Sequence, residues 1–251
     1  DYRQVCARMA EKVESKEENQ IFLASKVVQM SMSGDRVVVS TARGEHEARF
    51  VVNCAGLHSD RVTSLTETPK AKIIPFRGEY FEVFPEAHHL CRNLIYPVPD
   101  PSFPFLGVHF TRMIGGGLEC GPNAVLAFAR EGYTRTNVNW KDLAETLSYP
   151  GFLRLSAKYW RTGLGEMWRS FSKDAFVRAL QRLVPEIEEH HLEAVPAGIR
   201  AQAVTPEGKL VDDFLIQESS RVIHVGNAPS PAATSSLNIG RLIVEKLEAH
   251  F

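Results

Sequence analysis

The alternation of apolar and polar positions predicts a β-rich segment at the start of the chain. Apolar residues at helical spacing first predict a helix over 2–14, and the strands follow it. The expected strands are 21–23, 26–32, 36–41 and 48–54. Gly34-Asp35 has the composition of a two-residue hairpin turn. The last strand is almost continuously apolar, which is typical of a buried parallel strand.

The middle of the chain has a different pattern, in which aromatic strands alternate with Pro and Gly. The strands expected here are 80–84, 94–96, 105–110 and 113–118, and they predict an antiparallel sheet. Helical patterns follow at 140–147, 152–159 and 173–184. Ser172 is the expected N-cap of the last helix, and Pro185 is expected to end it.

The final part returns to strands and ends on an amphipathic helix. Strands are expected at 196–204, 214–216 and 221–225, with Asp212-Asp213 as a turn. Small residues and two prolines then lead into a helix whose apolar positions include Leu237 and Leu242. Unpaired amide groups at such a helix start favour an electron-rich oxygen. The same residues also fit a surface loop that caps a C-terminal helix.

A second strand-to-helix corner follows the buried strand 48–54. The strand leads directly into Ala55-Gly56 and then into a helix that carries Leu57, Val62 and Leu65. This geometry places backbone amides beside a phosphate or ribose, although a glycine needed only for close packing explains it equally well. Together the patterns predict a mixed α/β (α+β) fold, with an antiparallel-sheet domain at 71–192 inserted between 1–70 and 193–251.

Composition excludes several classes of protein and site. The net charge is −1 with both signs interspersed, so no electrostatic feature favours nucleic acid. The four cysteines are widely spaced and form no C-x-x-C pair, and the adjacent histidine pairs His88-His89 and His190-His191 cannot share one face, so we expect no metal site. No apolar run approaches the roughly 18 residues that span a bilayer.

Long strings of the chain resemble one protein family. The segments VVNCAGLHSDRV (51–62), PFRGEYF (75–81), IYPVPDPSFPFLGVHFT (95–111) and NAPSPAATSS (227–236) are similar to segments of the L-2-hydroxyglutarate dehydrogenases and oxidases. These are FAD-dependent members of the superfamily typified by D-amino-acid oxidase. The resemblance implies that 1–70 and 193–251 belong to an FAD-binding domain and that 71–192 binds the substrate.

The resemblance implies two sets of site residues. The cofactor set comprises Val27, Ala55, Gly56, Gly198, Asn227, Ala228, Pro229, Ser230, Ala232, Ala233, Thr234 and Ser235. The substrate set comprises Arg77, Tyr96 and Arg200, with His109 as the catalytic candidate. Structural roles remain open for each: an Arg77 pair with Glu79 or Glu82, a half-buried Tyr96, or a strand histidine at 109. Arg200 lies in a G-x-R segment, where a planar guanidinium suits a carboxylate.

The implied reaction is the oxidation of L-2-hydroxyglutarate to 2-oxoglutarate, with FAD accepting a hydride. The substrate is a 2-hydroxy dicarboxylate, and a quinone or oxygen takes the electrons. The resemblance also implies a cytoplasmic or mitochondrial location with peripheral association at the inner face of a membrane. The family's Gly-rich G-x-G-x-x-G turn has no counterpart here, and Gly115-Gly116-Gly117 opens no expected helix. We therefore expect a C-terminal portion of a longer enzyme, which alone would neither hold FAD nor turn over.

Two alternatives remain at this point. Another enzyme of the same superfamily would act on an amino acid or on glycerol 3-phosphate. A cofactor-free binding module would keep the substrate sheet alone.

Overall fold

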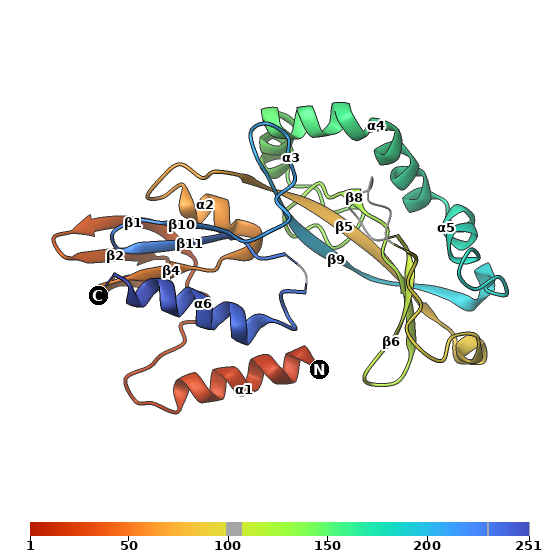
Figure 1. Ribbon diagram of the computed structural model, residues 1–251, viewed down its shortest axis with the longest axis horizontal. Helices are drawn as coiled ribbons and strands as arrows, with labels where there is room; N and C mark the ends of the chain where they lie inside the picture. Colours follow the sequence, from red (N-terminus) through yellow and green to blue (C-terminus); the bar gives the residue numbers. More distant parts are fainter. Residues whose placement is uncertain (99–106, 230, 251) are drawn as a thin grey trace. The chain divides into compact units, whose positions relative to one another are not determined.

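The chain divides into two compact units of mixed α/β content. The computed structural model describes residues 1–98, 107–229 and 231–250. Unit 1 consists of Asp1–Pro69 and Asp212–Phe251, and unit 2 of Lys70–Val211 (Figure 1). The expected boundary at residue 193 is corrected to residue 212. The reason is that β9 (Leu192–Val204) pairs with β5 (Lys72–Val83) along most of its length, which keeps this segment in unit 2.

Unit 1 contains an antiparallel three-stranded sheet close to the expected positions. Its strands are β1 (Val27–Ser33), β2 (Arg36–Thr41) and β3 (Gly44–Ala48), in the order β1-β2-β3. The hairpin at Gly34-Asp35 is confirmed, since Ser33 pairs with Arg36. The polar strand β3 was not expected from its sequence. The strand expected at 21–23 is wrong, because these residues lie in irregular backbone and a turn.

The second sheet of unit 1 has the order β10-β11-β4. Its strands are β10 (Leu215–Glu218), β11 (Val222–Asn227) and β4 (Val51–Asn53). Strands β11 and β4 are parallel, as expected, but β4 is shorter than the predicted strand 48–54: Ala48 ends β3 on the other sheet, and Val51 and Val52 are only half-buried. The short helices η1 (Gly56–His58) and α2 (Ser59–Thr63) follow β4. Met30, Val37 and Val222 form the core that joins the two sheets.

Two longer helices complete unit 1. Helix α1 (Tyr2–Glu14) has the expected bounds, and the Asp1 carboxylate caps it by accepting from the Gln4 amide. None of its residues is buried, and Val5, Met9 and Val13 are each more than 40% exposed. Helix α6 (Ser236–Glu248) follows β11 and buries Ile243. The apolar spacing therefore located both helices correctly but overestimated how much of each is covered.

Unit 2 is organised around the long strand β5. Strand β9 pairs with one edge of β5, and β7 (Leu118–Gly121) and β8 (Val125–Leu126) pair with the other. Strand β6 (His109–Arg112) adds to β7. All these pairings are antiparallel, as the sequence predicts. Residues 113–117 form the β6–β7 turn instead of a strand, because Gly116 and Gly117 take positive φ.

Two other expected strands are shorter than the pattern suggested. The strand at 94–96 reduces to an isolated bridge between Ile95 and Phe110. The strand expected at 105–110 begins at His109 in the described part of the chain, and residues 105–106 lie outside it.

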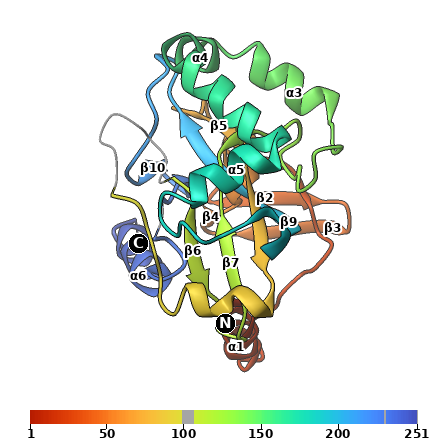
Figure 2. The ribbon, with the colours of Figure 1, turned by 90° about the vertical axis from the view of Figure 1, so that its right-hand side faces the viewer.

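One face of this sheet is buried beneath helices. Phe81, Val83, Phe110, Leu118 and Cys120 pack against Phe176, Val177 and Leu180 of α5 (Lys173–Leu180). Figure 2 shows α5 in front of these strands. Ser172 caps α5 as expected, accepting from the Ala175 amide. The helix ends at Leu180, before Pro185, because the chain turns at 181–183.

The remaining helices of unit 2 are α3 (Trp140–Leu147), α4 (Pro150–Phe171), η2 (Pro85–Leu90) and η3 (Glu189–His191). Helix α3 has the expected bounds, whereas α4 is 22 residues long and far exceeds the expected 152–159. A second core of Ile74, Tyr149, Leu155 and Val204 lies beneath the start of α4. The Tyr149 hydroxyl donates to the Val204 carbonyl over 2.9 Å, which ties this helix start to β9.

Candidate functional site

In unit 1, one edge of the parallel strand pair brings two predicted cofactor segments together. Val52 is in register with Ile223, and Asn53 with His224, so both strands end at the same edge. Ala55-Gly56 leaves β4 there, and the loop that begins at Asn227 leaves β11. The Ser59 hydroxyl links them by donating to the Gly226 carbonyl over 3.2 Å. Ligands of open α/β sheets bind outside the carboxyl ends of such strands.

The corner after β4 presents its backbone to solvent. The Asn53 side-chain oxygen accepts from the Ala55 amide at 3.0 Å and so fixes the turn. Gly56 has φ +53°, a left-handed conformation in which a side chain would be strained. A Cβ built there would meet no atom within 4 Å, and both Ala55 and Gly56 are exposed. A ligand can therefore approach this turn closely.

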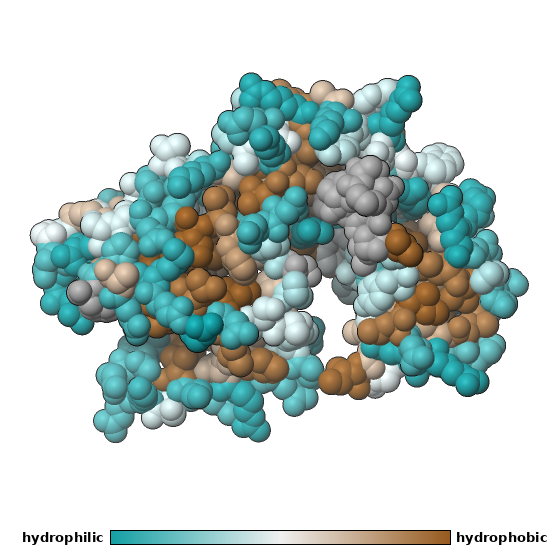
Figure 3. All heavy atoms as spheres, in the orientation of Figure 1, coloured by the Kyte–Doolittle hydropathy of each residue, from teal (hydrophilic) through white to brown (hydrophobic). Residues whose placement is uncertain are grey.

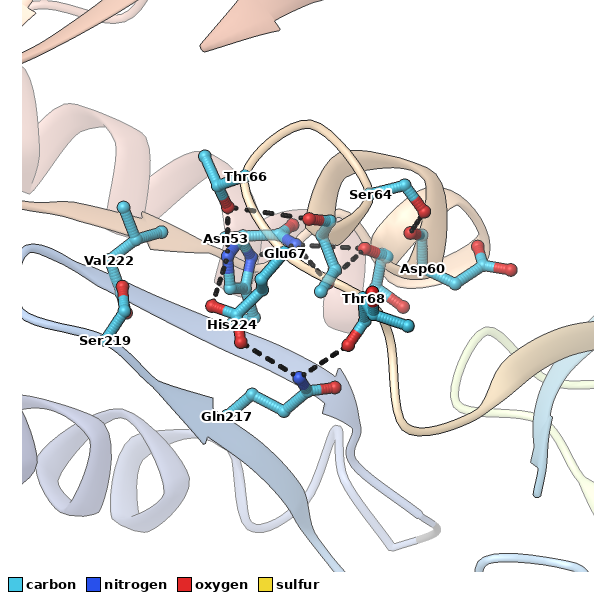
Figure 4. Close-up of polar contacts among 12 residues, drawn as sticks. Asn53, Asp60, Ser64, Thr66, Glu67, Thr68, Gln217, Ser219, Val222 and His224 are labelled. Atoms are coloured by element: carbon cyan, nitrogen blue, oxygen red, sulfur yellow. Dashed lines mark hydrogen bonds and ion pairs between the residues drawn. The ribbon is translucent and has the colours of Figure 1, made fainter. Parts of the chain in front are cut away.

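A buried histidine holds the corner in place, as Figure 4 shows. His224 is fully buried, with Nδ1 3.0 Å from the Asn53 amide nitrogen and Nε2 2.9 Å from the Thr66 hydroxyl. Because the Asn53 amide can only donate, Nδ1 is the acceptor and Nε2 carries the proton. Burial lowers the pKa of His224, and the Glu67 carboxylate 3.3 Å from Nε2 opposes that shift. The ring is therefore a neutral bridge between β11, β4 and the segment after α2.

The same network extends to β10. The Gln217 side-chain amide donates to Glu67 Oε2 at 3.1 Å and to the Thr68 carbonyl at 3.2 Å. Sequence reasoning missed this network. The available signal was a histidine within the β-branched strand 221–225, which is an uncommon place for an imidazole unless its nitrogens are satisfied.

The loop predicted to face the cofactor consists mainly of small residues. Asn227 is buried and donates to the Asp213 carbonyl over 2.9 Å, so it anchors the loop. Ala228 and Ala233 are exposed, and Pro229 and Ala232 are half-buried. Thr234 Oγ1 lies 2.9 Å from the Tyr2 hydroxyl. Ser230 lies outside the described residues.

The start of α6 fits a flat ligand with electron-rich oxygens. Ser235 occupies the N-cap position and its side chain makes no capping hydrogen bond, while the Ser236 amide donates to the Ala233 carbonyl at 3.3 Å. Small exposed neighbours allow close approach, and uncapped amides favour negative charge. Two members of the cofactor set lie elsewhere. Val27 begins β1 on the other sheet and packs against the core of Met30, Val37 and Val222, and Gly198 lies on β9 of unit 2.

In unit 2, the predicted substrate residues Arg200, His109 and Tyr96 are associated with the face of the sheet opposite α5. From residue 76 to residue 82, alternate residues of β5 on this face are half-buried or exposed and the residues between them are buried. Farther along the same face, Ile74, Gln202 and Val204 are buried. Phe76 is in register with Arg200, and Gly78 with Gly198. We call the uncovered part of this surface the open face and define it by Tyr80, His109, Gly198 and Arg200, because Phe76 packs into the core beneath α4. Arg200 is exposed on it.

His109 has the orientation that the sequence predicts. Val108 and Phe110 point into the core, with 9% and 0% exposure, and His109 between them is half-buried on the open face. Its ring centroid lies 4.5 Å from that of Tyr96, which is 45% exposed. Nδ1 lies 3.1 Å from the Gly107 carbonyl, which places the proton on Nδ1 and the lone pair on Nε2. Burial lowers the pKa of His109 and the Gly107 carbonyl opposes this, so the ring is neutral near pH 7.

Tyr80 of the open face and Glu119 of the neighbouring strand β7 were not singled out from the sequence. Tyr80 lies beside Gly198, where an added Cβ would be 3.6 Å from the tyrosine ring. Burial raises the pKa of Tyr80, and Glu119 and Tyr96 raise it further, so it remains a phenol that can donate a hydrogen bond. Burial also raises the pKa of Glu119, with a further contribution from Glu82. The alternation of β5 was the signal that could have placed Tyr80 here.

Arg77 occupies the opposite, buried face of β5. Its side chain is 5% exposed and donates through Nη2 to Glu79 Oε1 at 3.2 Å and through Nη1 to the Thr134 carbonyl at 3.3 Å. Arg77 therefore pairs with Glu79, as the structural alternative from the sequence proposed. The pair is buried, however, and does not lie at the surface. Arg77 and Arg200 do not share a face, and the structure does not bring the two expected carboxylate anchors together.

The described residues show neither a cluster suited to a metal nor a spanning helix. Within 1–98, 107–229 and 231–250, no three His, Cys, Asp or Glu side chains gather in a metal-binding arrangement. His88 contacts the Val83 carbonyl and His190 contacts Glu188. In the same ranges, no helix combines the length and apolar character needed to cross a bilayer.

Comparison with known proteins bears directly on the family. A model of the FAD dependent oxidoreductase family, DAO, matches residues 1–246. The L-2-hydroxyglutarate dehydrogenase of Indibacter alkaliphilus is 53% identical over 98% of this chain and 62% of its own length. The Escherichia coli K12 protein of the same name is 46% identical over 98% of this chain and 59% of its own length. The mouse protein, named as mitochondrial, is 44% identical over 86% of this chain and 48% of its own length.

Solved structures agree at the level of the fold. L-alpha-glycerophosphate oxidase from Mycoplasma pneumoniae superposes with a TM-score of 0.64 at 17% identity, over 89% of this chain and 50% of the oxidase. Glycine oxidase from Geobacillus kaustophilus superposes with a TM-score of 0.50 at 17% identity, over 92% of this chain and 50% of the glycine oxidase. The chain spans about three fifths of the length of the bacterial relatives. On the match over residues 1–246, the chain belongs to the FAD-dependent oxidoreductase family, as the resemblance predicts.

Proposed function

We propose that this chain forms part of an FAD-dependent dehydrogenase or oxidase that converts L-2-hydroxyglutarate to 2-oxoglutarate. The observation that carries the proposal is the open face of unit 2. An exposed arginine and a neutral histidine share one side of an antiparallel sheet, with tyrosine side chains beside them. The family match and the names of relatives that are 44–53% identical support the same reaction.

Each open-face residue has a chemical role in this proposal. Arg200 binds one substrate carboxylate, because its planar guanidinium can donate two parallel hydrogen bonds. Tyr80 and Tyr96 supply hydroxyl donors to the remaining oxygens. Nε2 of His109 accepts the proton of the 2-hydroxyl group, since its depressed pKa keeps it unprotonated near neutral pH. Arg77 remains a predicted second anchor, although Glu79 already neutralises it.

In this proposal the cofactor residues other than Gly198 belong to unit 1. Ala55, Gly56 and the loop from Asn227 to Ser235 hold FAD, with Asn53 and His224 fixing the corner beneath them. When bound, FAD supplies the acceptor for the hydride that leaves C2 of the substrate. Loss of this hydride and of the hydroxyl proton converts the alcohol to the ketone. Val27 and Gly198 stay predicted members of the cofactor set.

The finer assignments of acceptor and location are also proposals. We propose that a quinone or oxygen reoxidises the flavin, and that the enzyme associates peripherally with the inner face of a membrane. The location is cytoplasmic in a bacterium and mitochondrial in a eukaryote. The mitochondrial designation of the mouse relative supports the eukaryotic assignment.

The test compares substrates in two proteins. One is the 251-residue chain supplied with FAD. The other is a chimera in which the part of the Indibacter relative that this chain does not match is joined to it as it is joined there. We expect acceptor reduction by the chimera with L-2-hydroxyglutarate, well above that with glycine or glycerol 3-phosphate. A preference for either of the latter substrates would assign another reaction, and tight 2-oxoglutarate binding without flavin would indicate a binding module.

A further inference from the structure

Helix α4 exposes large apolar side chains along its whole length. Those of Leu153, Trp160, Leu164, Trp168 and Phe171 are between 53% and 69% exposed. From Trp160 to Phe171 the spacing of three or four residues places four of them on one side of the helix, and Leu153 precedes the break in helical geometry at Tyr159. We call this set the α4 stripe. Two of the three tryptophans of the chain lie in it, and a contiguous exposed aromatic stripe of this kind marks an interaction surface.

The residues beside the stripe are basic. Arg154, Lys158 and Arg161 are exposed on α4. The single acidic residue of this helix is Glu166, which is 8% exposed and ion-paired with Arg169. The accessible surface of α4 therefore combines aromatic and positively charged side chains without a compensating exposed carboxylate on the helix. Figure 3 shows brown and teal side chains adjoining along this segment at the upper edge of the view.

An apolar cavity of about 340 Å³ lies beside the stripe and is partly formed by it. Phe76, Leu126 and Leu155 line its inner side, and Trp160, Leu164 and Met167 line its outer side. The last three are also exposed, so the cavity is continuous with the α4 stripe. The helix departs from helical geometry at Tyr159, another lining residue, where φ is −114° and ψ is 18°. The open volume suits a flexible hydrocarbon chain better than a charged metabolite.

We propose that α4 docks on the surface of an anionic phospholipid bilayer, with the α4 stripe at the headgroup–acyl boundary and the cavity receiving the end of an acyl chain. Trp and Phe on one side of a helix and Lys and Arg beside them are the composition of helices that lie in a membrane interface. The basic side chains complement anionic headgroups, and this charge match favours a bilayer over a neutral protein surface. The inference deepens the peripheral association proposed above and rests on that proposal.

The experiment is vesicle co-sedimentation of the 251-residue chain, without substrate or turnover. One set of vesicles contains phosphatidylcholine alone, and the other equal parts of phosphatidylcholine and phosphatidylglycerol. We expect binding to the anionic vesicles and little to the neutral ones. Replacing Lys158 and Arg161 together by Gln should weaken partitioning about thirtyfold, because each basic residue near the surface contributes roughly 1 kcal/mol. Replacing Trp160 and Trp168 together by Ser should weaken it at least tenfold.

Ile114→Ser is the matched control, because Ile114 is 81% exposed in the β6–β7 turn and lies outside the α4 stripe. It should bind as the unchanged protein does. In a Trp140→Phe background, Trp160 and Trp168 are the remaining tryptophans, and their emission should shift to the blue and be quenched by spin-labelled lipid. The Lys158/Arg161 variant alters exposed side chains only, so it tests the proposal even if the tryptophan variant fails to fold.

Three results would overturn the inference: no sedimentation with anionic vesicles, equal partitioning of the Lys158/Arg161 variant and Ile114→Ser, or binding of monomeric fatty acid with no vesicle binding. Because substrate plays no part in the assay, a failure here leaves the proposed oxidation intact. A failure of oxidation would equally leave the vesicle result readable.

Discussion

Replacing Glu79 by Gln probes how strongly unit 2 depends on one buried carboxylate. Glu79 Oε1 accepts from Ser170 at 2.8 Å, from Arg135 at 2.9 Å and from Arg77 at 3.2 Å, and Oε2 accepts from Asn123 at 3.0 Å. The glutamine side chain would have the same size but one oxygen fewer and no charge. The guanidinium of Arg77, only 5% exposed, would then be left without its counter-charge.

The expected cost follows from the burial of this pair. Removing one partner of a buried ion pair costs about 3–5 kcal/mol, because it leaves an uncompensated charge away from water. The Arg135 side chain is 49% exposed, so solvent screens part of the network and the lower end applies. We therefore expect the free energy of unfolding to fall by about 3 kcal/mol at pH 7. For a domain of this size, that corresponds to a decrease in Tm of about 6–12 °C.

The pH dependence provides an independent check on the cause. Burial alone would raise the pKa of Glu79, but hydrogen bonds from Arg135, Ser170 and Asn123 outweigh it and hold the pKa below its usual value. A carboxyl whose pKa is lower in the folded state stabilises the protein above its unfolded pKa, about 4.3, and loses that contribution as the pH falls through the folded pKa. The difference in unfolding free energy between the unchanged protein and Glu79→Gln should have its full size at pH 7 and shrink below about pH 4.

Urea unfolding followed by circular dichroism at pH 7, 5, 4 and 3 measures this difference. Glu82→Gln is the control, because Glu82 is exposed on the same strand and should change stability by no more than about 0.5 kcal/mol. A loss below about 1 kcal/mol for Glu79→Gln at pH 7 would refute the assigned strength of the network. A difference that persists unchanged at pH 3 would refute the role of its charge.

Three further predictions concern the proposed reaction and are measured in the active chimera. His109→Gln should lower kcat/KM at least a hundredfold, while its free energy of unfolding stays within about 1 kcal/mol of that of the unchanged protein. Because burial lowers the pKa of His109, the acid limb of the wild-type pH profile of kcat/KM should lie below pH 6.5. A large stability loss with turnover preserved would mean a structural histidine. Arg200→Lys should lower kcat/KM by tens-fold, since Lys cannot form the bidentate contact, and unchanged kinetics would remove it from the site. Leu at Ala232 or Ala233 should weaken FAD retention by blocking close approach, and an unaltered flavin spectrum and affinity in both variants would contradict the loop assignment.

The sequence predicted elements best where local signals and tertiary structure agree. Helix α1 has the predicted bounds because Asp1 caps its start. The strand at 36–41 is reproduced because a Gly-Asp turn fixes its register. Strand β5 was underestimated, since Pro75 and Gly78 interrupt its pattern and are accommodated only by pairing on both edges. Pairing between distant strands is not visible in local composition.

The candidate site was predictable in part for the same reason. Alternation alone put His109 opposite Val108 and Phe110, and the structure confirms that placement. Alternation also separates Arg77 from Tyr80, but it does not say which face helices will cover. Packing decides this: α5 covers Phe81 and Val83 of the same strand face, and Ser170 and Arg135 contact Glu79, so Arg77 forms a buried ion pair and Tyr80 lies on the open face. The His224 network required the parallel register of β11 with β4, which no residue near His224 specifies.

The disagreements between pattern and burial are themselves informative. A hydrophobic side of a helix normally predicts a contact with the core, because burial of apolar area is the main stabilising force. Helix α4 meets its own core through Leu155, yet it leaves Trp160, Trp168 and Phe171 exposed on another side. Folding of unit 2 does not require those aromatic side chains at the surface, and their exposure opposes solubility. Sequences depart from consistent patterning mainly at functional surfaces, so the excess apolar residues of α4 indicate binding, and the neighbouring cations indicate an anionic surface.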